Sequence, residues 1–320
     1  MSPLLLLERS DSPLGEPGEG SAAHSPMTSL IPPAVRNRLK SLRLTARRAV
    51  NLQGLGLHHS RSRGAGLEFA QYRAYERGDE PRAIDWKLYA RSGRFFVRES
   101  ERESPLAVWL LIDTSASMRQ ADTETTRLAA ARSLAACIAE LALQQGDRFG
   151  LIGLSDDGLK LLPAGTGTRQ RDRLALDLHG LTAAGTFPAL AQLAPLWDRI
   201  GAHDLVVILS DFFDPAVLDL AGRLASAGRE TLGLEILTAS ERDFAFPGGH
   251  RFRDPETGEE LLGDGPALRA EFLTRFNDAR ADRHAKLDHL GIRHAALFLD
   301  QPLDTPLRRL FGSHAAAEYH

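Results

Sequence analysis

Oxygen-bearing side chains follow two of the most apolar segments of the chain. Asp113, Ser115 and Ser117 come directly after the apolar residues 108–112, and Asp211 follows residues 205–209 with only Ser210 between them. Thr186 lies between these two segments, next to Gly185. Carboxylates and hydroxyls without sulfur or imidazole suit Mg²⁺ or Mn²⁺ rather than zinc or copper. The sequence therefore predicts a Mg²⁺ or Mn²⁺ site formed by Asp113, Ser115, Ser117, Thr186 and Asp211.

An Asp-x-Ser-x-Ser triplet also has a plain alternative as a capping sequence after a strand, because Ser and Asp are common in turns. The order of all five side chains, and their position behind apolar runs, favours the metal site. A set with only two carboxylates leaves a bound ion electrophilic, so that an Asp or Glu of another protein can complete its coordination. We therefore expect a docking site and not a catalytic one.

The elements that position these residues follow from the alternation of apolar segments. Strands are expected at residues 106–112, 148–154, 159–162, 205–209, 231–237 and 292–299. Helices are expected at residues 125–145, 169–180, 188–200 (opened by Gly185-Thr186), 215–227 and 266–290, with a short one ending near Phe311. This alternation predicts an α/β fold with a mostly parallel sheet covered by helices on both faces. Functional loops are then expected at the carboxyl ends of the strands.

Composition divides the chain into four parts. Residues 1–33 are expected to be a disordered tail, residues 34–102 a basic N-terminal extension that packs on the main domain, residues 103–312 the main domain, and residues 313–320 a second tail. Residues 34–102 hold 16 Lys and Arg against 7 Asp and Glu, whereas residues 103–320 hold 22 against 31. The basic part is either a solvated surface that pairs with the acidic part or a nucleic-acid contact. The absence of a recognisable nucleic-acid-binding motif favours the first interpretation.

The basic part also contains an ordered segment at residues 76–93. A helix is expected there, capped by Asp79, with Pro81 in its first turn and Gly93 at its end. Charges of both signs between Arg73 and Arg91 alternate with Tyr72, Tyr75 and Trp86. That pattern suits either a salt-bridged layer against a sheet edge or a docking face.

The chain shows no sign of export. No cationic region precedes the short apolar run at residues 4–7, and no apolar run approaches the roughly 20 residues of a membrane helix. The single cysteine, Cys137, lies among helical apolar residues and suits a buried thiol in a reducing compartment. A cytoplasmic location is therefore expected.

The five candidate ligands resemble the metal-ion-dependent adhesion site of von Willebrand factor A domains. In that family the serines and the threonine coordinate the ion directly or through water, and the aspartates hold it. Ser210-Asp211-Phe212 departs from the common Thr-Asp-Gly of the family.

A second resemblance covers residues 54–312. It is carried by Gly64-Ala65-Gly66-Leu67-Glu68-Phe69, Tyr72-Arg73-x-Tyr75, Gly78-Asp79, Arg82-x-Ile84-Asp85-Trp86, Ala90-Arg91 and the turn at residues 254–259. This series is similar to the bacterial family called domain of unknown function 58. The resemblance implies a von Willebrand factor A-like, Rossmann-like fold. It also implies a MoxR-type AAA+ ATPase as partner, and a role in chaperone-like assembly or maturation of a client protein.

Two classes of function other than an adaptor remain as alternatives. An aspartate after a first strand can be the nucleophile of a Mg²⁺-dependent phosphoryl hydrolase, but the haloacid-dehalogenase pattern needs a second Asp where Ser115 stands. Nucleic-acid binding by the basic part is the other. The sequence has no Gly-x-x-x-x-Gly-Lys-Ser/Thr loop, so we do not expect the chain to hydrolyse nucleotide itself.

Overall fold

The computed structural model describes residues 26–44, 71–76, 81, 84–99, 105–122, 125–253 and 257–312. The chain forms two compact units, one of Met1–Leu52 together with Leu106–His320, and one of Gln53–Pro105. The two predicted tails lie largely outside the described residues.

A six-stranded sheet forms the centre of the larger unit. Its strands are β3 (Ala107–Asp113), β6 (Arg148–Ser155), β7 (Gly158–Gly165), β8 (Leu205–Ser210), β9 (Glu230–Leu237) and β12 (Arg293–Phe298). They lie in the order β12-β9-β8-β3-β6-β7, and every neighbouring pair is parallel except β6 and β7. With the strands renumbered along the chain this is the order 3-2-1-4-5-6 of doubly wound sheets. The predicted Rossmann-like fold class is therefore confirmed.

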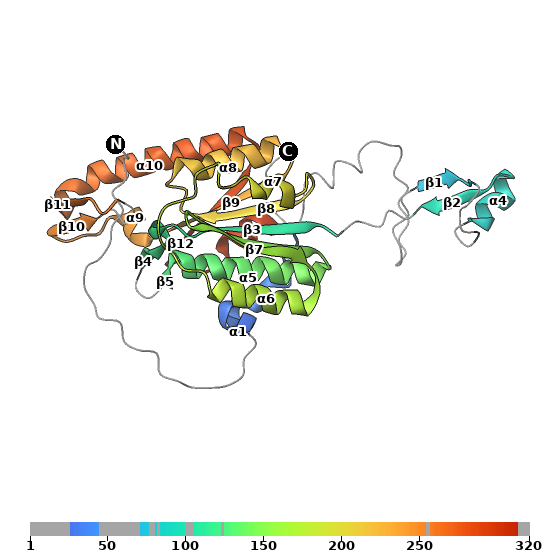
Figure 1. The fold of residues 1–320 in the computed structure, drawn as a ribbon, viewed down its shortest axis with the longest axis horizontal. Coiled ribbons are helices and arrows are strands. Elements are labelled where there is room, and N and C mark those ends of the chain that lie inside the picture. The colour runs from blue at the N-terminus through green and yellow to red at the C-terminus, as the bar shows by residue number, and fades with distance from the viewer. Residues whose placement is uncertain are drawn as a thin grey trace. The chain divides into compact units, whose positions relative to one another are not determined.

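Helices cover both faces of this sheet (Figure 1). On one face lie α5 (Arg127–Gln145) and α6 (Gly167–His179), and on the other α7 (Pro195–Arg199), α8 (Pro215–Ser226) and α10 (Gly265–His289). Alternate residues of β3 serve the two faces, because Leu110 packs in the core with α5 while Trp109 and Leu111 pack in the core with α8. All seven residues of β3 are buried, as expected for a strand covered on both sides.

The chain segment between β9 and α10 contains further short elements. It forms α9 (Ala239–Asp243) and the hairpin of β10 (Gly249–Arg253) and β11 (Glu260–Asp264), and α11 (Thr305–Phe311) follows β12. Buried Glu235 of β9 joins the sheet to α10, because it accepts hydrogen bonds from Arg280 at 2.8 Å and Arg283 at 3.0 Å. Burial alone would raise the pKa of Glu235, but the hydrogen bond with His284 and these two guanidinium groups lower it to about 2.

The predicted boundary between a tail and an extension at residue 33 is wrong. The helices α1 (Pro26–Leu30) and α2 (Pro33–Leu39) and the residues between them bury Met27, Ile31 and Leu39 in the same core as α5. Residues 26–44 therefore belong to the larger unit. Helix α2 ends at Leu39, and residues 40–44 follow it without helical structure.

The smaller unit contains the antiparallel strands β1 (Gln71–Ala74) and β2 (Phe96–Glu99), with α4 (Trp86–Ser92) between them in the sequence. The helix begins later than predicted, because Asp85 and not Asp79 is its cap and accepts from the N–H groups of Lys87 and Leu88 at 2.9 and 3.0 Å. It ends at Gly93, as predicted, in the left-handed conformation at φ 68°. Asp79 lies outside the described residues.

One predicted helix of the larger unit is mostly absent. Residues 190–194 form turns, and only Pro195–Arg199 is helical. Pro195 accounts for the break, because it has no backbone N–H to donate to residue 191 in a continuous helix and stands instead at the first position of α7. Thr186 therefore lies in an extended loop and not at the start of a helix.

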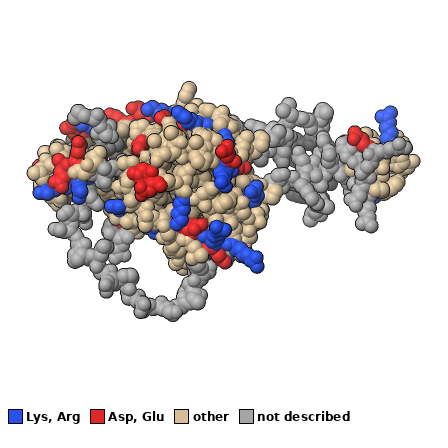
Figure 2. All heavy atoms as spheres, in the orientation of Figure 1, with Lys and Arg blue, Asp and Glu red and all other residues tan. Residues whose placement is uncertain are grey.

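The surface of the larger unit carries charges of both signs. On its visible face Lys and Arg side chains lie among Asp and Glu side chains (Figure 2). Among the described residues, none of the helices combines the length and the apolar character that crossing a bilayer would require.

The central position of β3 gives a stability prediction. Leu110 is fully buried at the middle of this strand, whereas Leu176 of α6 is 62% exposed. Leu110→Ala should lower the free energy of unfolding by about 2–5 kcal/mol, and Leu176→Ala should change it by less than about 0.5 kcal/mol. Urea unfolding followed by tryptophan fluorescence measures both values, and equal losses in the two variants would contradict this account of the core.

Candidate metal centre

Asp113 lies at the carboxyl end of the central strand, where the buried backbone gives way to a short turn. Its Oδ1 accepts the backbone N–H of Ser115 at 2.9 Å, and its Oδ2 accepts the hydroxyl of Ser210 at 2.6 Å. The hydroxyls of Ser115 and Ser117 lie 3.1 Å apart and form a hydrogen bond with each other. Asp113, Ser115 and Ser117 are each at most 2% exposed. The structure therefore brings the predicted triplet together.

The loop that carries Thr186 lies beside this turn. The backbone carbonyl of Gly185 accepts from the N–H of Ala116 at 2.9 Å, and the N–H of Ala184 donates to Thr114 at 2.8 Å. The predicted fourth ligand, Thr186, is thereby held at the rim, where it is exposed.

Asp156 fixes the conformation of that loop. Its Oδ2 accepts the backbone N–H of Thr186 at 3.0 Å and the Thr186 hydroxyl at 3.4 Å, and the first of these bonds keeps the pKa of Asp156 below its ordinary value. Gly185 has φ +63°, and a Cβ there would lie 2.2 Å from Oδ1 of Asp156. Asp156 lies in the turn between β6 and β7, and it also positions the rim of the site.

Asp211 comes from the third loop, directly after β8. Its Oδ1 accepts the backbone N–H of Phe213 at 3.0 Å, and its Oδ2 accepts from the guanidinium of Arg127 at 2.6 Å. Phe212, which stands where the von Willebrand pattern has glycine, adopts the left-handed conformation at φ 58° with its side chain buried. The loop therefore accepts a residue other than glycine at the cost of a strained backbone.

Arg127 is the first residue of α5 and is completely buried. Besides Asp211, its guanidinium binds the carboxylate of Glu241 in α9 and the carbonyl of Ser117, the latter at 3.2 Å. Burial by itself would lower the pKa of Arg127, but Glu241 and then Asp211 outweigh it and raise the pKa. One cation thus joins the loops that follow β3, β8 and β9.

The charges of this cluster are unbalanced. Asp113, Asp211 and Glu241 are buried carboxylates, and Arg127 is the cation that binds two of them. Burial, and then the negative charge of Asp211, raise the pKa of Asp113 to about 6, although bonds from Ser210 and Ser115 oppose this shift. Asp113 receives hydrogen bonds from neutral donors.

The donor set fits a divalent cation. Such an ion would compensate the charge of Asp113, and the hydroxyls of Ser115, Ser117 and Thr186 are oxygen ligands of the kind that Mg²⁺ and Mn²⁺ accept. Within the described parts of the chain, no three His, Cys, Asp or Glu side chains converge into a metal-binding group. The candidate site is therefore one in which hydroxyls outnumber freely available carboxylates.

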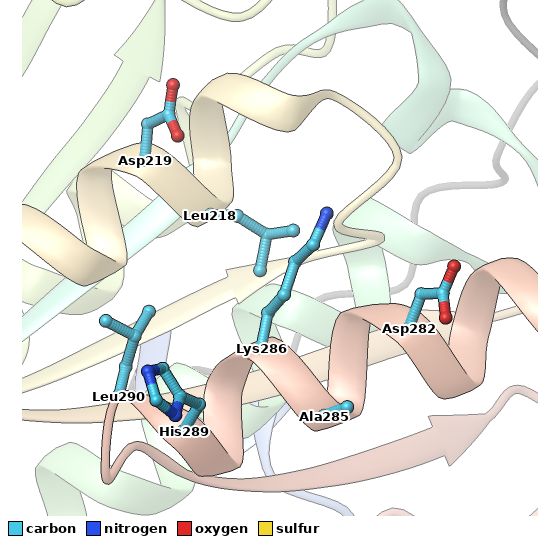
Figure 3. A pocket seen from close by; sticks show the side chains of 7 residues that line it. All are labelled: Leu218, Asp219, Asp282, Ala285, Lys286, His289 and Leu290. Carbon is cyan, nitrogen blue, oxygen red and sulfur yellow. The ribbon is translucent and has the colours of Figure 1, made fainter.

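A second concave surface lies away from these loops. It is a groove of about 600 Å³ between α8 and α10, lined by Leu218 and Asp219, by four residues of α10 between positions 282 and 289, and by Leu290 directly after that helix (Figure 3). None of the five predicted ligands lines it. Its walls are mainly apolar and lack the converging oxygen atoms of the site at the strand ends.

Residues 71–282 match the family described as "Protein of unknown function DUF58". The chain is also 28% identical over 256 residues to "Uncharacterized protein Rv1480" of Mycobacterium tuberculosis and to "Uncharacterized protein Mb1516" of Mycobacterium bovis. Each match covers 78% of this chain and 80% of the relative.

Solved structures with some similarity include von Willebrand factor A-type domains. The conserved hypothetical protein BatB of Bacteroides thetaiotaomicron has 14% identity and a TM-score of 0.34, and the match covers 58% of this chain and 98% of that one. The SpRpn10 VWA domain has 15% identity and a TM-score of 0.36, with coverage of 64% and 94%.

The raised pKa of Asp113 gives a pH-dependent stability in the metal-free protein. Between about pH 4 and pH 6 the folded state binds more protons at this carboxyl than the unfolded state, so the stability due to Asp113 falls as pH rises through its folded pKa. Asp113→Asn should remove this dependence and become more stable relative to the wild type as pH rises. Urea unfolding in EDTA across this window measures the difference, and parallel curves would refute the expectation.

Proposed function

Because the chain belongs to the DUF58 family and gathers oxygen ligands around an uncompensated carboxylate, we propose that it is a non-enzymatic, metal-dependent protein-binding adaptor. The observation that carries the proposal is the pairing of buried Asp113 with the two serine hydroxyls, 3.1 Å apart. Mg²⁺ is the proposed ion, with Mn²⁺ as its substitute.

The residues have separate roles in the proposed site. Asp113 supplies the negative charge, Ser115 and Ser117 supply buried hydroxyls, and Thr186 supplies a hydroxyl at the exposed rim. Asp211 stands behind them and is held by Arg127. A bound Mg²⁺ supplies a positive charge with coordination positions left for an acidic side chain of the partner. The rim at Thr186 is the side from which that side chain approaches.

The hydrogen bonds of Asp211, the second carboxylate of the site, favour docking over hydrolysis. A phosphoryl hydrolase of the type considered above needs a carboxyl group near Asp113 that can transfer a proton. Position 115 is serine, and both oxygens of Asp211 are already bonded, one of them to a guanidinium. These residues bind and orient but offer no general acid beside Asp113.

The proposed partner is a MoxR-type AAA+ ATPase, and the proposed task is chaperone-like assembly or maturation of a client protein in the cytoplasm. Two observations support this proposal. The family membership agrees with the resemblance that suggested such a partner. The sequence has no phosphate-binding loop of its own, so a separate ATPase would have to supply energy.

The metal site can be tested by calorimetry with the full chain. Asp113→Ala should lower Mg²⁺ affinity by more than about 100-fold, because it removes the carboxylate that lacks a cationic partner. The folded sheet should persist in circular dichroism. Asp157→Ala is the matched control, because Asp157 is an exposed carboxylate in the same region, and it should leave the affinity unchanged. Equal Mg²⁺ affinity in wild type and Asp113→Ala would overturn the proposed site.

The partner can be tested with a purified MoxR-type ATPase from the same genome. Wild type should bind it in Mg²⁺ and lose binding in EDTA, and Ser115→Ala combined with Ser117→Ala should weaken binding at least about tenfold, because two ligands of the ion are removed. Biolayer interferometry gives the dissociation constants. Binding that is indifferent to EDTA would contradict metal-dependent docking. A phosphatase activity present in wild type and lost in the double variant would support the hydrolase instead.

A further inference from the structure

The buried guanidinium of Arg127 is an unusual neighbour for a cation site. It lies within hydrogen-bond distance of Asp211 and of the carbonyl of Ser117, and it also binds Glu241. Its Nε has no hydrogen-bond partner within the described residues. The guanidinium carbon lies 5.1 Å from the ring centroid of Phe213, so the group is enclosed by protein on that side as well.

The bonds of Asp211 decide which carboxylate is available to an ion. Oδ2 of Asp211 is bonded to a cation and Oδ1 to a backbone N–H. Asp113, in contrast, receives hydrogen bonds from the hydroxyl of Ser210 and the N–H of Ser115, which are neutral donors. A bound ion would therefore lie near two carboxylates of different kinds. The charge of Asp113 has no cationic partner, whereas the charge of Asp211 is already compensated by Arg127.

The sum of the buried charges favours an ion of one particular charge. Three ionised carboxylates and one guanidinium leave the fully buried cluster of Asp113, Asp211, Glu241 and Arg127 at a net charge of −2. Asp122 also acts on Arg127, but it is only half-buried and is bonded to Ser240 outside this cluster. Uncompensated charge inside a protein is costly, so the cluster is most stable with an ion that brings its total to zero. A divalent cation does so, whereas a monovalent ion leaves negative charge and a trivalent ion adds positive charge.

We propose that Arg127 is the internal counter-charge that sets the valence of the ion, by binding Asp211 and Glu241 and leaving Asp113 as the freely available carboxylate. Arg127 is thus a positioning residue and a determinant of ion selectivity. This inference rests on the proposed metal site. The competing account is that Arg127 only ties three loops together, in which case its removal weakens the binding of every ion alike.

A series of charge variants in the full chain separates these accounts. Arg127→Gln changes the net charge of the cluster to −3, Glu241→Gln changes it to −1, and the double variant restores −2. The probes are Mn²⁺ and Tb³⁺, with dissociation constants from competition calorimetry. The ratio of Tb³⁺ to Mn²⁺ affinity is the quantity compared, because differences in ionic size cancel between variants.

The expected ratio follows the net charge. Relative to wild type, the ratio should rise on the order of tenfold in Arg127→Gln and fall on the order of tenfold in Glu241→Gln. Each substitution changes the net charge of the cluster by one unit, and Tb³⁺ responds more strongly than Mn²⁺ because it carries one more positive charge. The double variant should return to within a few-fold of the wild-type value. If Arg127→Gln does not fold, Glu241→Gln, which is isosteric and keeps a side-chain oxygen for Arg127, still tests the direction.

Two results would overturn the inference in distinguishable ways. Mn²⁺ binding by wild type with an unchanged ratio in the folded variants would reject the role of Arg127 and leave the proposed adaptor site intact. Absence of Mn²⁺ and Mg²⁺ binding by wild type would reject the metal site and this inference together.

Discussion

The ion pair between Arg127 and Asp211 is the interaction on which the loops at the carboxyl edge of the sheet depend. The guanidinium of Arg127 and the carboxylate of Asp211 lie 2.6 Å apart, and both side chains are buried. Removing either partner would leave the other as an unpaired buried charge, which is costly. Glu241 extends it to α9, where the other oxygen of its carboxylate accepts the backbone N–H of Thr238 in a capping box. Loops far apart in the sequence thus share one buried cation, and a movement of any of them disturbs the others.

The position of this cluster follows from the topology of the sheet. β3 and β8 are parallel neighbours at the point where the order of connections reverses, and in such sheets the loops on either side of that point diverge to leave room for a ligand. Both strands are buried on both faces. The polar groups of the site are therefore removed from water at the end of a fully buried strand. This explains why the pKa of Asp113 is raised to about 6 although its hydrogen bonds with Ser210 and Ser115 act to lower it.

Those parts of the structure that depend on local pattern could be predicted from the sequence. The apolar run before Asp113 required a strand buried on both faces, and such a strand ends where the first carboxylate appears. Arg127 could not be recognised in the same way, because an arginine at the start of an amphipathic helix is usually exposed, and its partners lie 84 and 114 residues further along. The role of Asp156 could not be recognised either, because its contact with Thr186 spans 30 residues and the local pattern around it indicates only a turn. The prediction of a helix at residues 188–200 was wrong. The apolar spacing there resembles that of a helix, but Pro195 interrupts the backbone hydrogen bonds of a continuous one.

The unequal exposure of the hydroxyls determines how the proposed site can be approached. Ser115 and Ser117 are enclosed, whereas Thr186 is exposed and its hydroxyl is held by Asp156 through a contact of 3.4 Å, which is long for an O–H···O hydrogen bond. The Thr186 hydroxyl is therefore the one that can turn from Asp156 toward an ion at least cost, while the backbone bond from Thr186 to Asp156 keeps the loop in place. A partner carboxylate must then enter beside Asp156, which carries the same charge. Docking at this rim is thus expected to depend on the ion itself, because without its positive charge the rim of the site repels the group that it is proposed to bind.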